Sequence, residues 1–333
     1  MTTVDSVFQT RFLVTTVNRI APVRTPVLDK VFAVKERSLS SNIEFDVETD
    51  AEGISVSAPP SSPATVIKKD GYDHVVVPAP RFPEKTPITP AELDKIRSMG
   101  SNAPMLAAEK VGQELAKLRA RTDRTREFMA IKALSGTVVD GAGKTLVTFT
   151  FPDGHKPVLA AKKRWSDSES NPLVDIRAWK ELISAATGGA VETFYGFCAS
   201  DVMDALLEHP KLAELLKNQM GQQLVETGRI GRLAGVETEE VSGTYKDKNG
   251  NRLKMMPAGY IAIVGVGYGN TAEAFAPPED FKAADGIGSG QLPELYFAKS
   301  WEEDDPSVLW LKAESRPLPL VKRPGCIVYA KVL

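Results

Sequence analysis

The hydrophobic and polar positions between residues 103 and 136 follow the pattern of one long helix. Ser101 and Asn102 are cap-type residues before it, Pro104 suits the first turn, and Gly136 provides a C-terminal stop. At 1.5 Å per residue this helix would be roughly 48 Å long. Its apolar stripe is thin and falls into two groups, Val111, Leu115 and Leu118, then Phe128, Ile131 and Leu134. The charged middle predicts a rod that lies across a surface rather than inside a core.

Before this helix the pattern has a period of two. Residues 43–48 alternate apolar and acidic side chains, which predicts a half-buried strand. Residues 50–90 hold short alternating pieces and a turn-rich tip near Pro59, Pro60 and Pro63, which predicts a long, poorly buried hairpin. Such a stretch counts against a compact domain, so it is either disordered or an arm that orders on another subunit. Its many Val, Ile and Phe residues weigh against disorder.

The remaining chain mixes helices and strands without regular βαβ alternation, so the predicted class is α+β. Residues 1–40 resemble an arm that ends in a short helical turn. The other expected elements are a hairpin turning at 140–143, helices at 172–187, 200–209 and 210–220, a strand at 191–198, a hairpin turning at 248–250, a loop at 269–293, and strands at 308–315 and 326–333.

The composition of the chain argues against some classes of function. The chain has 333 residues, 41 basic and 43 acidic, and a formal net charge of −2. This balance argues against a dedicated nucleic-acid binder, which needs a basic excess. Cys198 and Cys326 stand far apart and fit buried thiols in a reducing compartment. The sequence shows neither a signal peptide nor 18 uninterrupted apolar residues, so we expect a soluble protein made inside the cell.

Two glycine-containing segments invite a nucleotide-binding interpretation. Gly141 to Thr145 ends like a phosphate-binding loop, but position 138 is Val and the following residues alternate like a strand. Gly265, Gly267 and Gly269 do not complete a dinucleotide fingerprint, because position 270, which must be Gly or Ala, is Asn, and no helix pattern follows. A hairpin turn and a strand end are therefore the preferred interpretations.

No constellation of catalytic or metal-binding residues emerges. His74, His155 and His209 are scattered, with no metal-ligand spacing and no nucleophile elbow nearby. Asp201 and Asp204 are better explained as part of a helix-capping segment than as catalytic carboxylates. Residues 302–305 are better explained as a solvated acidic loop. The sequence predicts no enzyme, no cofactor and no metal site.

Five segments in order resemble the major capsid proteins of tailed bacteriophages, specifically the lambda-type capsid protein E family. They are TDRTREFMAIKALSG (122–136), Arg164-Trp165 before Asn171-Pro172, HPKLAELL (209–216), GTYKDKNGNRLKMMPAGYIAIVG (243–265), and the carboxyl end from Lys299. The resemblance covers nearly the whole chain. It implies the Hong Kong 97-like capsid fold, with an N-terminal arm, an extended β-hairpin loop, a peripheral domain with a long spine helix, and an axial domain.

The resemblance also implies an approximate domain division. Residues 1–37 become the arm, and 38–171 the first part of the peripheral domain, with the extended loop at about 50–90 and the spine helix at about 103–135. Residues 172–300 become the axial domain, and 301–333 supply closing strands of the peripheral domain.

The implied function is assembly into hexamers and pentamers of a head shell that encloses double-stranded DNA, in virions built in the host bacterial cytoplasm. The partner would be the chain itself through head-to-tail contacts, with scaffold, portal and decoration proteins as further partners and no membrane. The candidate inter-subunit contacts are Val56, Lys68, Lys69 and Val76 of the loop and Arg119, Arg121, Arg124 and Glu127 of the long helix. Pairing within the helix, Arg119 with Asp123 and Arg124 with Glu127, is an equal alternative.

Two other functions stay open at this point. An encapsulin-type cellular compartment would share the fold but enclose cargo enzymes. A nucleotide-binding enzyme would use Gly141 to Thr145.

Overall fold

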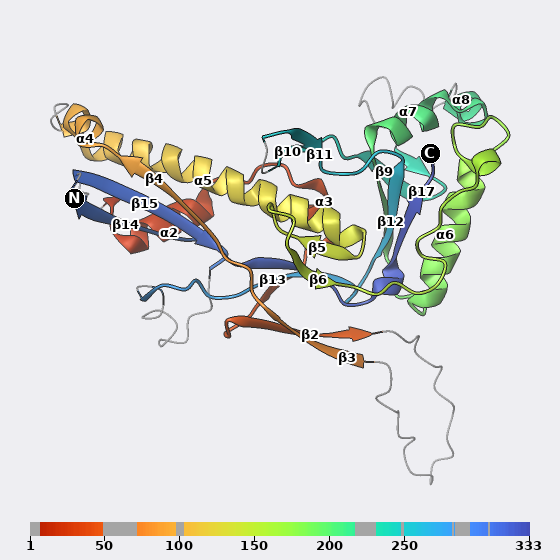
Figure 1. Ribbon diagram of the computed structural model, residues 1–333, viewed down its shortest axis with the longest axis horizontal. Helices are drawn as coiled ribbons and strands as arrows, with labels where there is room; N and C mark the ends of the chain where they lie inside the picture. The colour runs from red at the N-terminus through yellow and green to blue at the C-terminus, as the bar shows by residue number, and fades with distance from the viewer. Residues whose placement is uncertain are drawn as a thin grey trace, which may run out of the picture.

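The long helix α5 (Ala103–Leu134) organises the computed structural model, which describes residues 7–48, 72–97, 103–216, 231–247, 250–281, 283, 294–305 and 307–333. Figure 1 shows a flat, elongated molecule, with α5 along one part and a block of shorter helices around a sheet at the other end. The helix ends as predicted, because Gly136 adopts a φ of 89° and its N–H donates to the Ala133 carbonyl.

The two halves of the apolar stripe on α5 belong to two separate cores. Val111, Leu115 and Leu118 pack with the N-terminal helix and the sheet strands beside it. Phe128, Ile131 and Leu134 belong to the larger core that continues into the other end of the molecule. One side of the charged middle is buried as well, with Arg119, Asp123, Arg126 and Glu127, whereas Lys117, Arg121 and Arg124 are exposed. The expectation of a rod lying across a surface therefore holds only for the exposed side. Burial of the other side is tolerated because its polar groups find partners within the chain.

The N-terminal segment folds onto α5 instead of extending from the molecule as a free arm. It contains α2 (Thr10–Arg19), α3 (Pro26–Val31) and β1 (Lys35–Arg37). Leu13 and Val17 of α2 are fully buried in the smaller core, and Val27 and Leu28 of α3 are buried in the larger one. The apolar residues near the N-terminus thus cover this chain's own helix.

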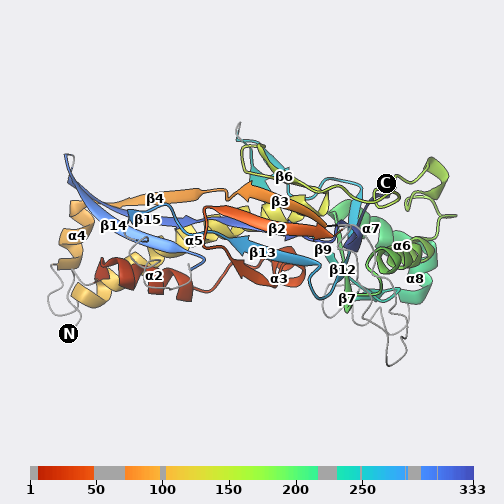
Figure 2. The ribbon, with the colours of Figure 1, turned by 90° about the horizontal axis from the view of Figure 1, so that it is seen from below.

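A three-stranded sheet lies against the N-terminal half of α5, in the order β14-β15-β4. The strands are β14 (Phe297–Asp304), β15 (Ser307–Ser315) and β4 (Phe82–Ile88), all antiparallel to their neighbours. In Figure 2, β4 and β15 lie towards the upper edge of the molecule, and α2 lies towards the lower edge. A short helix, α4 (Pro90–Arg97), leads from β4 towards α5.

The predicted hairpin of residues 50–90 takes a different form. β2 (Asn42–Glu48) pairs with β3 (Tyr72–Pro78), and the buried Ile43 and Phe45 confirm the alternating pattern. Residues 49–71, with Val56, Lys68 and Lys69, lie outside the described residues. Residues 82–88 leave the hairpin and join the sheet beside α5. The part of the chain that projects in Figure 1 is therefore the β2–β3 pair.

A five-stranded sheet forms the other end of the molecule, in the order β17-β12-β7-β9-β8. Its strands are β17 (Ile327–Lys331), β12 (Tyr260–Val266), β7 (Thr193–Cys198), β9 (Val236–Glu240) and β8 (Arg232–Leu233). The surrounding helices are α6 (Pro172–Ala186), α7 (Ser200–Glu208) and α8 (Pro210–Leu216), all close to their predicted positions. The two hairpins expected from turn residues are β5 (Thr137–Val139) with β6 (Thr145–Thr148), and β10 (Thr244–Lys246) with β11 (Arg252–Lys254).

Two strands were not predicted from the sequence. β13 (Thr271–Phe275) lies in the predicted loop 269–293, and β16 (Pro317–Val321), which contains two prolines, lies between the two predicted strands 308–315 and 326–333. They pair with each other, and β1 completes this sheet. The closing segment 301–333 is divided, since β15 lies beside α5 whereas β17 lies in the five-stranded sheet. Short 3-10 turns occur at Ala161–Lys163 and Pro324–Cys326.

Candidate functional site

Three side chains of α5, spaced four residues apart, hold the main chain of the N-terminal segment. Arg119 is the first of these. Its Nη1 donates to the carbonyl oxygens of Val17, at 2.7 Å, and Asn18, at 3.1 Å, near the C-terminus of α2. Its guanidinium also lies 4.9 Å from the ring centre of Tyr296. A cation at a helix C-terminus interacts favourably with the helix dipole.

Glu127 binds main-chain N–H groups at the start of α3, whereas Arg119 binds carbonyl groups. Because α3 begins at Pro26, the N–H groups of Val27 and Leu28 have no partner within the helix. The two carboxylate oxygens of Glu127 accept these hydrogen bonds, each at 3.0 Å. Burial raises the pKa of Glu127 to about 7 against the effect of these two bonds, and the nearby Asp29 and Glu239 add to the rise.

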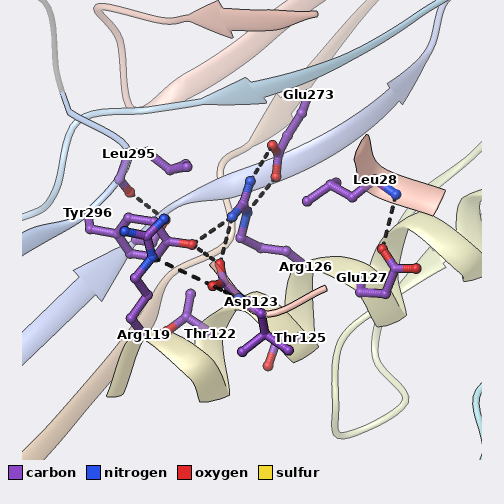
Figure 3. Close-up of polar contacts among 12 residues, drawn as sticks. Leu28, Arg119, Thr122, Asp123, Thr125, Arg126, Glu127, Glu273, Leu295 and Tyr296 are labelled. Carbon is purple, nitrogen blue, oxygen red and sulfur yellow. Dashed lines mark hydrogen bonds and ion pairs between the residues drawn. The ribbon is translucent and has the colours of Figure 1, made fainter. Parts of the chain in front are cut away.

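Asp123 lies between them, and its Oδ2 accepts a hydrogen bond from the Val23 N–H at 3.4 Å. Asp123 also belongs to a buried network (Figure 3). Arg126 donates to both oxygens of Glu273, at 2.8 and 2.6 Å, and to Asp123 Oδ1 at 2.8 Å. The Tyr296 hydroxyl accepts from Arg126 at 2.6 Å and donates to Asp123. Lys35 adds a second cation, 2.7 Å from Glu273. The network therefore ties α5 to β13, to β1 and to the residues before β14.

The charges in this network are mutually stabilised. Burial alone would raise the pKa of Glu273, but Arg126 and Lys35 outweigh it and hold that pKa below its ordinary value. Burial alone would likewise lower the pKa of Arg126, and Glu273 raises it instead. Glu273, Asp123 and Arg126 are 0%, 0% and 5% exposed, so losing one partner would strand an unpaired buried charge.

The exposed side of α5 carries two of the predicted contact residues. The Arg121 side chain is 71% exposed, although its Nε lies 2.9 Å from Glu84 of β4. Arg124 is exposed and lines a cavity of about 320 Å³ together with Arg24, Glu127 and Glu239. These two arginines remain available to a partner.

The other predicted contact residues divide into three groups. Val76 is 50% exposed on β3. Arg119 and Glu127 are 8% and 6% exposed within this single chain, so they have little surface left for a neighbour. The predicted pairing of Arg119 with Asp123 is confirmed, with 3.6 Å between Arg119 Nε and Asp123 Oδ2. The carboxylate of Glu127 accepts hydrogen bonds from the start of α3 instead of serving chiefly as a partner of Arg124. Val56, Lys68 and Lys69 lie outside the described residues.

The segment Gly141 to Thr145 forms the turn between β5 and β6, which confirms the hairpin turn predicted from the sequence. Asp140 Oδ1 accepts hydrogen bonds from the N–H groups of Ala142 and Lys144, both at 2.8 Å. These two N–H groups are therefore already hydrogen-bonded within the turn, and a strand rather than a helix follows. A phosphate-binding loop needs free N–H groups at a helix start.

The histidines lie apart in the structure as they do in the sequence. His74 contacts Asp46, His155 contacts the Ile327 carbonyl, and His209 contacts Ser170. Within the residues that the structure describes, no group of three or more His, Cys, Asp or Glu residues could hold a metal ion. None of the described helices has the length and apolar character needed to cross a membrane.

One surface of the molecule was not predicted from the sequence, and we call it the tip platform. It is the face of the β14-β15-β4 sheet that points away from α5, and it is defined by Lys85, Pro87, Lys299, Trp301, Trp310 and Lys312. The turn-type residues Asp305-Pro306 between two β-type runs were a signal for the hairpin that brings Trp301 and Trp310 together. Glu273 and Tyr296 were missed because their partners are more than 140 residues away.

Comparison with solved structures identifies the fold. The chain is similar to a prophage capsid protein from E. coli CFT073, with a TM-score of 0.65 and 17% identity over 97% of this chain and 99% of the other. It is also similar to a phage-related protein from Bordetella bronchiseptica RB50, with a TM-score of 0.60 and 12% identity, covering 96% of each chain. The capsid of an empty GTA particle matches with a TM-score of 0.52 and 13% identity over 94% of this chain and 91% of that one. The fold is thus the Hong Kong 97-like fold of phage capsid proteins.

Sequence comparison gives the family. The family model described as phage major capsid protein E matches residues 9–332. The major capsid protein of Salmonella phage Felix O1 is 28% identical over 285 residues, which cover 74% of this chain and 75% of that protein. The chain belongs to the phage major capsid protein E family, as the five sequence segments predicted.

Proposed function

We propose that this chain builds the head shell of a tailed phage by assembling with copies of itself into hexamers and pentamers. The family match across residues 9–332 carries this proposal. The shell encloses double-stranded DNA as its content. Assembly takes place in the host cytoplasm, and scaffold, portal and decoration proteins are the further partners that we expect.

The shape of the subunit supports head-to-tail assembly. In Figure 1, the β2–β3 pair projects at one long edge, whereas α5 lies towards the opposite edge. A contact between two different edges of identical subunits is heterologous, and it closes into a ring when the rotation permits. The exposed Arg121 and Arg124 lie on the α5 side, and Glu44, Asp46 and the half-exposed Val76 lie on the hairpin. Opposite charge thus supports a contact from hairpin to helix.

The role that we propose is structural and not catalytic. The buried polar groups described above pair with one another or with main chain, as groups that fix a scaffold do. An encapsulin-type compartment remains the alternative with the same fold, and it is distinguished by its contents. Particles purified from infected or expressing cells would contain DNA or be competent to receive it under our proposal, and would contain a folded cargo enzyme under the alternative.

Sedimentation of the purified protein tests the proposal. We expect ring oligomers or closed particles under assembly conditions, with a scaffold protein supplied where the phage encodes one. A chain that sediments only as a monomer in all of these conditions would contradict the proposed assembly.

A further inference from the structure

The β2–β3 pair is attached to the rest of the subunit at both of its ends. The attachments come from the two sides of β16, with Arg316 directly before this strand and Arg323 shortly after it. Their partners, Ser41 and Glu48, lie at the two ends of β2. Seven positions separate these partners in the sequence, so an extended strand places the two attachments about 23 Å apart. Two attachments at that distance fix a direction, whereas a single one would leave a pivot.

Arg316 holds the base of the pair through main-chain carbonyl groups. Its Nη2 donates to the carbonyl oxygens of Ala79, at 3.0 Å, and Ser41, at 3.3 Å. Its Nη1 donates to the Pro277 carbonyl at 3.0 Å, and its Nη2 lies 3.2 Å from Glu279 Oε1. Arg316 is only 4% exposed. Because Ser41 precedes β2 and Ala79 follows β3, one planar guanidinium fixes both strands at their shared base.

Arg323 holds the end from which the pair continues away from the body. Its Nε donates to Glu48 Oε2 at 2.5 Å, and the Glu48 N–H donates to the Lys322 carbonyl at 2.7 Å. The N–H groups of Lys322 and Arg323 both donate to the Asn270 carbonyl, so this end of β16 is itself fixed. The side chains of Arg323 and Glu48 are 18% and 14% exposed. Salt screens such a partly buried pair much less than a surface pair.

Apolar packing holds the pair between these two attachments. Ile43 and Phe45 of β2 are buried, and the ring of Phe45 lies 6.2 Å from that of Phe149. Apolar burial is non-directional, so it keeps the pair on the body without selecting one angle. Hydrogen bonds from a guanidinium are directional and charge-assisted, and here they lie at the two ends, where they control the angle most strongly.

We propose that Arg316 and Arg323 are positioning residues for assembly, which set the direction in which the β2–β3 pair projects from the subunit in Figure 1. The inference rests on the proposed function, because the direction of a projecting pair matters to a neighbouring copy. In the competing interpretation, the packing of Ile43 and Phe45 sets the direction, and the two arginines contribute stability alone.

Double electron–electron resonance on the unassembled, full-length chain measures this direction. One nitroxide is attached at Asp73→Cys, near the outer end of β3, and the other at Arg177→Cys on α6. Both positions are exposed, whereas the native Cys198 and Cys326 are buried. The doubly labelled chain should give one narrow distance distribution.

Arg323→Met should widen that distribution about two-fold, because the shielded carboxylate of Glu48 loses its cation. The matched control is Lys322→Met, since the side chain of Lys322 pairs with Glu36 of β1 instead, and it should leave the width unchanged. Arg323→Lys keeps the charge beside Glu48 and should restore the narrow distribution. An unchanged width in Arg323→Met, or equal widening in Lys322→Met, would overturn the proposal.

Arg316→Met tests the attachment at the base and should also widen the distribution. Circular dichroism first establishes that this variant is folded, because Arg316 is buried. If it does not fold, the comparison of Arg323→Met with Lys322→Met and Arg323→Lys decides the question.

The yield of closed particles connects the direction to assembly. At a temperature at which both variants are folded, Arg323→Met should lower the yield about 10-fold relative to Lys322→Met, because the same misdirected contact recurs at every copy of a closed assembly. A widened distribution with an unchanged yield would overturn the role in assembly. If the wild-type protein forms no particles, the proposed function fails instead, while the distance distributions still decide whether the two arginines set the direction.

Discussion

The buried side chains of α5 recognise main chain rather than side chains of the N-terminal segment. Arg119 binds carbonyls at the end of α2, and Glu127 binds amides at the start of α3. Each charge has the sign that its helix end prefers. Folding of the segment onto α5 thus depends on the positions of two helix ends, which explains how a charged stretch can occupy the gap between two apolar cores.

Arg126→Met tests the buried network. The substitution keeps most of the volume but leaves Glu273 and Asp123 without their shared cation. Breaking a buried pair by removing one partner costs about 3–5 kcal/mol, and urea denaturation of the unassembled protein measures this loss. The matched control is Arg121→Met, whose exposed pair with Glu84 is worth less than about 1 kcal/mol. Equal losses for the two variants would show that the network is not a stabilising element.

Glu127→Gln tests the titration of the buried carboxyl. The pKa of Glu127 is about 7 in the folded protein, against about 4.3 for a free glutamate. The folded state therefore binds more protons between these values, so the contribution of this carboxyl to stability is greatest below about pH 4.3 and is lost as pH rises through about 7.

The measured quantity is the difference in unfolding free energy between wild type and Glu127→Gln at several pH values. The wild type should lose stability relative to the variant over that window, by at most about 4 kcal/mol. Glu114→Gln serves as control, because Lys117 and Lys110 lower the pKa of that buried carboxyl against the opposing effect of burial. A difference that is independent of pH, or that grows in the opposite direction, would contradict the assignment.

At the scale of elements, the two glycines of the α5 region have opposite roles. Gly136 has a φ of 89°, and an added Cβ would lie 3.0 Å from the Phe149 carbonyl oxygen. Gly112 lies inside the helix with nothing within 4 Å of an added Cβ. We expect Gly136→Ala to destabilise by about 1–2 kcal/mol and Gly112→Ala to stabilise by up to about 1 kcal/mol. Thermal unfolding of both variants measures these effects, and stabilisation by Gly136→Ala would refute its role as the helix stop.

Local patterns predicted the elements whose signals are local. The long helix, the helix at 172–186, the strand at 193–198 and the turns at Asp140–Gly143 were all found from period, caps and turn residues. β13 was missed because the Gly-, Ala- and Pro-rich segment around it resembles a loop, and β16 was missed because it contains two prolines. They form strands since each supplies the other with hydrogen-bonding partners, which is a tertiary effect.

The candidate site was predicted only in part for the same reason. The charges on α5 were visible in the sequence, and the pairing of Arg119 with Asp123 follows from helical spacing. Their burial was not predictable, because Glu273, Tyr296 and the N-terminal segment come from distant parts of the chain. A charged stripe alone does not reveal whether it faces water or another segment.

At the scale of the whole molecule, the edges of the flat subunit decide how copies meet. Arg121 and Arg124 remain exposed on the α5 side. Reversing both charges, with Arg121→Glu and Arg124→Glu, should lower the yield of assembled particles several-fold at low salt without lowering the melting temperature of the subunit by more than a few degrees. Arg177→Glu, on the exposed face of α6, provides a matched control. Equal particle yields for the two variants would rule out a contribution of the α5 stripe to assembly.

Our proposal that this chain builds a closed shell from copies of itself can be tested by electron microscopy of the purified, expressed protein. We expect closed particles whose reconstruction shows five-fold and six-fold rings of one subunit type, with the β2–β3 pair of each subunit reaching over its neighbour. Isolated subunits, or fibres without closed rings, under every assembly condition tried would contradict it.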